Sequence, residues 1–423
     1  MNSPECHQLP NGLKVVLVPC EAESVAFGLF IASGSRHETA KTAGISHFIE
    51  HMLFKGTPTR RCVDITREIE GRGGNFNACT SEESTCYYAH LPSECLDRAV
   101  DIISDMYLNA TIPDDEFERE KAVVIEEIKM YADEPDSVAM ENLQRGLFPA
   151  STLGAPVAGS PASLEPLRPE GLRAYIKSHY LATNTVAVLV GAFESARALE
   201  LVGRALGGAC ARRRTERRLP SPLAARAVAL KSATKEIFQA QLALGYRTFG
   251  IRDRRKYAAT VLDGVLGRGM SSRLFQEVRE KRGLSYDISS RMQFFQDAGM
   301  FVVTAGLDAA RREQALATID RELEKIRTRK ISAAELKRTK DFLIGNFRLS
   351  HEKVTSKLFF YGQTALSFGR LVTPAEQIEG IRSVTPDDVM AVADAVFRPV
   401  NRCVSWVLPA GAAQSPKGER VAK

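Results

Sequence analysis

The sequence predicts an α+β protein of two homologous domains, each a mostly antiparallel β-sheet backed by helices. Its 423 residues exceed the length that one hydrophobic core usually supports. Short apolar runs at 13–19 and 299–307 indicate strands, whereas residues 115–133 have the periodicity of a long helix. Strands and helices mixed in each half indicate sheets with helices packed on one face. An internal repeat indicates that the arrangement occurs twice.

This repeat relates the two halves of the chain. Residues 167–190 (LRPEGLRAYIKSHYLATNTVAVLV) align without a gap on residues 384–407 (VTPDDVMAVADAVFRPVNRCVSWV). Each copy has a proline where a helix begins, then a short turn, then an apolar strand. A second pair of similar segments is found at 116–128 and 335–347.

The repeat and the local composition predict the domain boundaries. The segment between the two halves is rich in charge and proline, as linkers are. We expect a first domain at 1–210, a basic and proline-containing linker at 211–228, and a homologous second domain at 229–423.

Composition and charge exclude several classes of protein. The net charge is +6, and the basic run at 211–218 (ARRRTERR) contains no aromatic residue, so we expect no nucleic-acid partner. Eight cysteines without a CxxC pair indicate neither a thiolate zinc knot nor a disulfide scaffold. The chain shows no signal-peptide pattern and no apolar stretch near the roughly 20 residues of a membrane span. We therefore expect a cytoplasmic protein that does not bind membranes.

The candidate site begins with the pentapeptide HFIEH. On an α-helix, positions i and i+4 share a face, so His47 and His51 could hold one metal ion. Glu50 lies beside them and suits a general base better than a ligand. Taken alone, an HxxEH sequence on a helix is more often an ordinary surface pair.

A catalytic zinc site needs a third protein ligand and an open position. The helical segment EREKAVVIEEI offers Glu120 and Glu127, two turns apart on one face, with Glu126 directed elsewhere. The equivalent positions in the second half are Thr339 and Asn346, which carry no carboxylate. A metal site of this kind is therefore expected only in the first half. Together, these residues indicate a metal-dependent hydrolase.

Four separated motifs make the chain resemble a known family. They are GISHFIEHMLFKGT, GGNFNACTSEESTCYYAHL, EREKAVVIEEIKMYADEP and GRGMSSRLFQEVREKRGLSY, in this order along nearly the whole chain. The order H-x-x-E-H inverts the more common H-E-x-x-H and is typical of inverzincins. The chain thus resembles the pitrilysin (inverzincin) metallopeptidase family, and within it the branch of the mitochondrial processing peptidase and its bacterial relatives.

The resemblance implies a role for each candidate residue of the site. His47, His51 and Glu127 correspond to the family's ligands of Zn²⁺. Glu50 corresponds to the glutamate that activates water, and Glu120 to a glutamate that supports a ligand by hydrogen bonding or holds water.

The resemblance also implies how a peptide is held. The segment GGNFNACTSEES is similar to the family's edge strand, to which an extended peptide adds through its backbone, and places Asn77 and Ala78 nearest the scissile bond. In the second half, Arg279 and Tyr286 match a pair that reaches across to the substrate carbonyl. Arg282 competes with Arg279 for this assignment, and the spacing to Tyr286 favours Arg279.

The resemblance further implies partners. Two domains form half of the family's clamshell chamber, so we expect a homodimer, or else a heterodimer with a metal-less sister subunit. The substrate would be a peptide or an unfolded segment, and the acidic residues Glu134, Asp136 and Glu141 could favour basic residues near the cut. The alternatives are a non-catalytic assembly subunit of the same fold and a metallohydrolase for another substrate.

Overall fold

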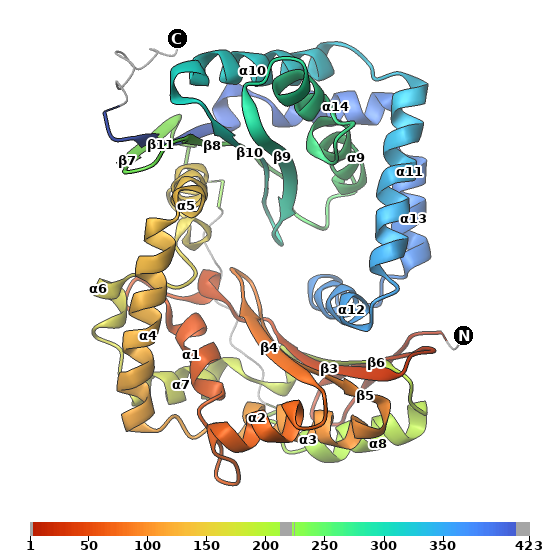
Figure 1. Cartoon of the computed structure of the whole chain (residues 1–423). Helices are drawn as coiled ribbons and strands as arrows, with labels where there is room; N and C mark the ends of the chain where they lie inside the picture. The colour runs from red at the N-terminus through yellow and green to blue at the C-terminus, as the bar shows by residue number, and fades with distance from the viewer. Residues whose placement is uncertain (1–2, 212–221, 224, 412–423) are drawn as a thin grey trace.

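The computed structural model describes residues 3–211, 222–223 and 225–411. It contains two β-sheets, one from each half of the chain (Figure 1). Most of the linker predicted at 211–228 lies outside the described residues. In the part of the chain that is described, no helix combines the length and apolar character needed to cross a membrane.

The first sheet has six strands in the order β1-β2-β6-β3-β5-β4. Their bounds are β1 (Glu5–Gln8), β2 (Lys14–Pro19), β3 (Ser24–Ile31), β4 (Asn75–Thr80), β5 (Thr85–Pro92) and β6 (Thr185–Gly191). All neighbouring strands are antiparallel except β2 and β6, which are parallel. Strand β4 forms one free edge of this sheet, and that edge leads to the candidate site.

Helices of the first half cover one face of this sheet (Figure 1). They are α1 (Ile45–Leu53), α2 (Cys62–Glu70), α3 (Leu96–Asn109), α4 (Asp114–Asp133), α6 (Pro161–Leu164), α7 (Pro169–His179) and α8 (Ser195–Leu206). Their apolar faces bury a core with alternate residues of the strands, such as Leu17, Phe27 and Leu189.

The second sheet repeats this design with five strands in the order β7-β11-β8-β10-β9. The strands are β7 (Leu230–Lys235), β8 (Ala240–Thr248), β9 (Ser285–Phe294), β10 (Gly299–Leu307) and β11 (Arg402–Pro409). The helices are α9 (Lys256–Gly267), α10 (Arg312–Thr328), α11 (Ala333–Ser350), α13 (Pro374–Ser383) and α14 (Pro386–Val396). The predicted fold class, two homologous sheets backed by helices, is confirmed.

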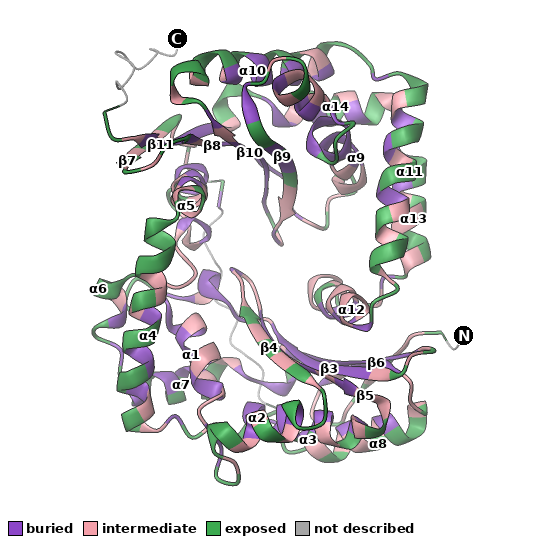
Figure 2. Cartoon of the chain, in the orientation of Figure 1, coloured by how far each residue is buried: buried purple, intermediate pink, exposed green. Residues whose placement is uncertain are grey.

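The halves also exchange one helix each, which the sequence pattern did not predict. Helix α5 (Pro135–Leu147) comes from the first half but packs on β8 and β11, where Leu143 is fully buried. Helix α12 (Val354–Phe368) comes from the second half but packs on β3 and β6 through Leu358. Both sheets are therefore covered on two faces. Figure 2 shows the central strands β3 and β6 as largely buried, whereas the edge strand β4 and the outer faces of α4 and α11 are partly exposed.

A buried arginine also joins the halves. Arg36 is 3% exposed, and its Nη2 donates to both carboxylate oxygens of Asp297 at 2.7 Å. Arg36 also pairs with Glu83, whose carboxylate accepts from the backbone N–H of Gln296 at 3.0 Å. Asp297 and Gln296 lie between β9 and β10, so the two sheets are linked by charge as well as by the exchanged helices.

Candidate metal centre and substrate-binding edge

The local sequence anchors helix α1, which carries HFIEH. Gly44 precedes the helix with a φ of 91°, and a Cβ there would lie 2.6 Å from the carbonyl oxygen of Ala158, so glycine is required. The buried carboxylate of Glu38 accepts from the backbone N–H groups of Gly44 at 2.7 Å and Ser46 at 2.8 Å. These bonds satisfy free donors at the helix N-terminus and fix the helix that presents the histidines.

Packing between α1 and α4 brings the remaining candidate residues to the histidines. Phe48 of α1 and Phe117 of α4 are both fully buried, with ring centroids 4.8 Å apart. Helix α4 turns Glu120 and Glu127 toward α1, whereas Glu126 is exposed and pairs with Lys129 at 2.7 Å. The prediction that Glu126 points elsewhere is confirmed.

The three predicted ligands converge. Oε2 of Glu127 lies 3.3 Å from Nε2 of His51 and 3.7 Å from Nε2 of His47. One donor atom from each of the three residues lies within 4.8 Å of the others, and among the described residues this is the sole group of its kind. Oε2 of Glu127 is buried without a hydrogen bond, as a carboxylate oxygen directed at a metal would be. Two imidazoles and a carboxylate suit zinc, so the residues present fit this ion.

A second carboxylate, from Glu120, contacts the other ring nitrogen of His51. Nδ1 of His51 lies 2.9 Å from Oε1 of Glu120, and Lys55 pairs with the same carboxylate. Burial opposes charge on Glu120, but the bonds from His51 and Lys55 prevail and lower its pKa. Burial likewise opposes charge on His51, but Glu120 and Glu127 raise its pKa. The bond orients the ring so that Nε2 faces Glu127.

The environment of His47 differs from that of His51. Burial and the neighbouring His51 lower the pKa of His47, with Glu127 acting in the opposite direction. Nδ1 of His47 is buried without a hydrogen-bond partner. A neutral imidazole is the form that binds a metal ion.

Glu50 faces the free edge of β4. Oγ1 of Thr80, at the end of β4, donates to Oε2 of Glu50 at 2.5 Å. Burial raises the pKa of Glu50, although bonds from the hydroxyl and backbone N–H of Thr80 partly offset this. A carboxylate with a raised pKa is better suited to accept and return a proton near neutral pH.

The backbone of β4 is available for pairing beside Glu50. The N–H of Thr80 is directed at Glu50, and two residues earlier the N–H of Ala78 has the same orientation. The N–H of Ala78 is bound by Oδ1 of its neighbour Asn77 at 2.8 Å, so a peptide that pairs with this edge must displace that side chain. The Ala78 side chain packs against the core, which leaves only its backbone for substrate.

Arg279 and Tyr286 contact each other in the second half. The chain forms a π-helical turn over Phe275–Glu280, and the Arg279 guanidinium lies 5.2 Å from the centre of the Tyr286 ring. Tyr286 is 77% exposed. Arg282, the competitor, is instead bound to Glu277 at 2.6 Å. Among the described residues, no hydrogen bond or ion pair joins Arg279 or Tyr286 to the histidines.

Three contributors to the site were missed in the sequence: Glu38, Lys55 and Thr80. Lys55 follows His51 by four residues, so helical spacing could have identified it. Thr80 follows Ala78 by two residues, so strand alternation could have placed it on the same edge. The acidic residues Glu134, Asp136 and Glu141 are exposed, and their predicted effect on specificity stays a prediction.

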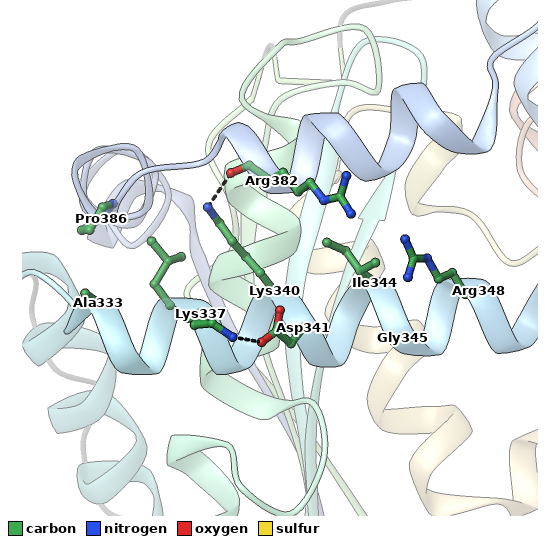
Figure 3. A pocket seen from close by; sticks show the side chains of 10 residues that line it. Ala333, Lys337, Lys340, Asp341, Ile344, Gly345, Arg348, Arg382 and Pro386 are labelled. Atoms are coloured by element: carbon green, nitrogen blue, oxygen red, sulfur yellow. Dashed lines mark hydrogen bonds and ion pairs between the residues drawn. The ribbon is translucent and has the colours of Figure 1, made fainter.

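A pocket of 560 Å³ lies away from this site, along α11 and beside α13 (Figure 3). Two of its lysines are engaged: Lys337 pairs with Asp341 at 2.7 Å, and Lys340 donates to the carbonyl oxygen of Arg382 at 2.6 Å. None of the predicted site residues lines this pocket. It is therefore separate from the chemistry of the His47 cluster.

Comparisons with known proteins agree with this geometry. The family model described as "Insulinase (Peptidase family M16)" matches residues 14–160, and "Peptidase M16 inactive domain" matches 166–343. An uncharacterized zinc protease of Bacillus subtilis is 34% identical over 92% of this chain and 94% of its own length. One of Streptomyces coelicolor is 33% identical over 91% and 85%, respectively. The crystal structure of a Helicobacter pylori protease shares the fold with a TM-score of 0.88 and 22% identity, over 96% of this chain and 99% of that chain.

Proposed function

This chain belongs to peptidase family M16, and on that premise we propose that it is a zinc-dependent endopeptidase. Its substrates are peptides or unfolded segments bound in extended form. The observation that carries the proposal is the convergence of His47, His51 and Glu127 beside Glu50 and the free edge of β4. The names of the relatives as zinc proteases support the same class of reaction.

In this proposal, His47, His51 and Glu127 hold the zinc ion. Zinc in this position supplies Lewis acidity, which polarises a peptide carbonyl and makes water more acidic. Glu120 holds His51 in the orientation that keeps Nε2 on the side of Glu127. The absence of these carboxylates from the equivalent helix of the second half supports a single site per chain.

Glu50 moves the proton. Its carboxylate accepts a proton from the attacking water and delivers it to the amine nitrogen that leaves when the peptide bond breaks. The hydroxyl of Thr80 holds the carboxylate at the edge of β4, and the raised pKa of Glu50 suits both transfers. Thr80 is thus a positioning residue.

The substrate forms a further strand on β4. The N–H of Ala78 would donate to a substrate carbonyl once the Asn77 side chain leaves it. Arg279 and Tyr286 would bond the substrate carbonyl from the second half. The contact between them and the engagement of Arg282 by Glu277 support the choice of Arg279.

We also propose the finer assignments that follow from the family. The chain acts in the cytoplasm as a homodimer with two active sites, or with a metal-less sister subunit, in the manner of the processing-peptidase branch. Light scattering of the purified chain tests this, because a monomeric mass at working concentration would contradict the homodimer. We further propose that the acidic residues Glu134, Asp136 and Glu141 favour basic residues near the cut. Cleavage of peptides with and without arginine near the scissile bond tests this, since equal rates would contradict the preference.

The experiment that tests the function combines zinc content with hydrolysis of a quenched, extended peptide. Glu50→Gln should retain zinc but lose activity by several orders of magnitude, because Glu50 transfers the proton and does not hold the metal. Glu127→Gln should lose both zinc and activity. The neighbouring Glu126→Gln is the matched control and should retain both, since Glu126 is exposed on the same helix.

Two other outcomes would support the alternative functions. A folded wild-type chain that binds no zinc and cleaves no peptide would support the non-catalytic assembly subunit. A chain that binds zinc but cleaves only a non-peptide substrate would support the other metallohydrolase.

A further inference from the structure

A second pocket, of 630 Å³, lies beside the start of β4. Asn75 of β4 and Tyr88 and His90 of β5 contribute one wall, and the corner between α11 and α12 contributes the other through His351, Phe359 and Phe360. Figure 1 shows this corner at the point where the chain passes from the second half to the inner face of the first sheet. None of these residues belongs to the metal centre or to the predicted substrate-binding set.

The pocket shares a face of the sheet with the edge strand. Asn75 pairs with His90, and Asn77 pairs with Tyr88, so their side chains lie on the face covered by α12. The alternate residues Phe76 and Ala78 face the opposite core. A peptide added to β4 would therefore direct alternate side chains toward this pocket.

The distance along β4 also suits a substrate pocket. Asn75 precedes Ala78 by three residues, which corresponds to about 10 Å in an extended strand. A peptide that places its scissile bond near Ala78 and Glu50 would thus place a side chain three or four residues away at the pocket.

The lining determines what kind of side chain fits. Every described residue that lines the pocket is apolar, aromatic or uncharged and polar at neutral pH. Burial lowers the pKa of both His90 and His351, so both rings are neutral there. Phe359 and Tyr88 form an edge-to-face pair 5.2 Å apart, which leaves an aromatic wall. The described residues that line the pocket offer no charge with which a charged side chain could pair, so such a side chain would lose water there without that compensation.

His351 extends the aromatic wall of the pocket. Its ring lies 4.2 Å from that of Phe347 and 4.7 Å from that of Phe360. Both of its ring nitrogens are buried, and neither bonds another side chain. The three rings thus add to the aromatic surface that an entering ring would contact.

We propose that this pocket binds a bulky, uncharged aromatic side chain of the peptide substrate, three or four residues from the scissile bond. The proposal rests on the proposed peptidase function and adds a specificity determinant to it. The pocket selects which extended segment is held on β4, while the His47 cluster acts on whichever bond lies beside Glu50.

The test is a positional series of quenched peptides. The cut in one parent peptide is first located by mass spectrometry, and phenylalanine, alanine, aspartate or lysine is then placed at each position up to five residues on either side. At one position, three or four residues from the cut, we expect phenylalanine to exceed alanine by about tenfold in kcat/KM. Aspartate and lysine should be no better than alanine there.

Variants of α12 assign this preference to the pocket. Ser356→Trp fills the pocket and should abolish the preference for phenylalanine, whereas Ser367→Trp, on the same helix but outside the lining, should retain it. Gln363 is an exposed lining residue, so Gln363→Glu adds charge without bulk and should shift the preference toward lysine. This second substitution keeps the test valid if the tryptophan variant does not fold.

The outcomes separate this proposal from the proposed function. If peptides are cleaved but no position prefers phenylalanine, the pocket proposal is wrong while the peptidase function stands. The same conclusion holds if the preference is unchanged in both Ser356→Trp and Gln363→Glu. If no peptide is cleaved, binding of the same fluorescein-labelled series to the wild-type chain gives the answer. A preference for phenylalanine that is lost in these variants then supports the pocket alone, and its absence overturns the pocket.

Discussion

Nδ1 of His51 lies 2.9 Å from Oε1 of Glu120 while Nε2 of the same ring lies 3.3 Å from Oε2 of Glu127. The two glutamates come from one helix, α4, and contact opposite nitrogens of one imidazole. The ring is therefore held between a supporting carboxylate and a carboxylate that shares its proposed metal site. Such supporting carboxylates orient metal-binding histidines and strengthen their basicity.

Replacing the supporting carboxylate should weaken metal binding without abolishing it. Glu120→Gln removes a charge from Nδ1 of His51 and releases Lys55. We expect zinc affinity to fall by roughly 10- to 100-fold, measured by competition with a chelator of known affinity. Glu118→Gln, at an exposed position of α4, should bind zinc as the wild type does. Equal affinities in all three proteins would contradict the role of Glu120.

Thr80 should affect turnover more than binding. Thr80→Val preserves shape but removes the hydroxyl that donates to Glu50 at 2.5 Å. A hydrogen bond to a charged group contributes about 1.5–3 kcal/mol, which corresponds to roughly 10- to 100-fold in rate. We expect kcat to fall by this factor while KM and zinc content stay near wild type. Thr66→Val, on α2, where the hydroxyl donates to the carbonyl oxygen of Cys62 at 3.2 Å, is the control. A change confined to KM would count against this role.

Tyr286 should contribute to turnover through its hydroxyl if it bonds the substrate. Tyr286→Phe retains the ring beside Arg279 but removes the donor, so we expect kcat/KM to fall by roughly tenfold with zinc content unchanged. Arg282→Lys should have a small effect, since Arg282 is bound to Glu277. A larger loss for Arg282→Lys than for Arg279→Lys would reverse the assignment of the two arginines.

Glu38 should make stability depend on pH. Burial raises its pKa from an ordinary value of 4.5 to about 7, although the N–H groups of Ser46 and Gly44 oppose this. Between these values the folded chain holds a proton that the unfolded chain releases, so the free energy of unfolding decreases as pH rises. The loss between pH 4.5 and 7 is at most about 3 kcal/mol.

The measurement is urea unfolding at pH 5 and pH 7.5. The free energy of unfolding should decrease less from pH 5 to pH 7.5 in Glu38→Gln than in the wild type, because the variant has no carboxyl to titrate at this position. Glu94→Gln, at an exposed position, should match the wild type. If the free energy of unfolding changes equally between the two pH values in all three proteins, Glu38 titrates normally.

The exchanged helices should make the two halves depend on each other. Leu358 of α12 is fully buried in the cluster with the first sheet, so Leu358→Ala should lower the free energy of unfolding by about 2–5 kcal/mol. Leu349→Ala, at a position 63% exposed, should change it by less than about 0.5 kcal/mol. Fluorescence-monitored urea unfolding measures both, and an unchanged midpoint for Leu358→Ala would contradict the contribution of α12.

Much of the fold was predictable because its signals are local. The strand at 299–307 and the helix at 115–133 follow from periodicities that involve only near neighbours. The repeat at 167–190 and 384–407 follows from aligning the two segments residue by residue. The structure places β10 over Gly299–Leu307 and α4 over Asp114–Asp133. The exchange of α5 and α12 was not predictable, because an apolar helix face does not specify which sheet it covers.

The sequence by itself determined which residues share a helical face: His47 with His51, and Glu120 with Glu127. That relation follows from 3.6 residues per turn and needs no tertiary contact. Only the tertiary structure decided that the two faces meet, because Phe48 packs on Phe117 across 69 positions of the chain. Packing between distant segments depends on the whole core rather than on either segment, and it also directs Thr80 at Glu50 and places His351 beside the edge strand.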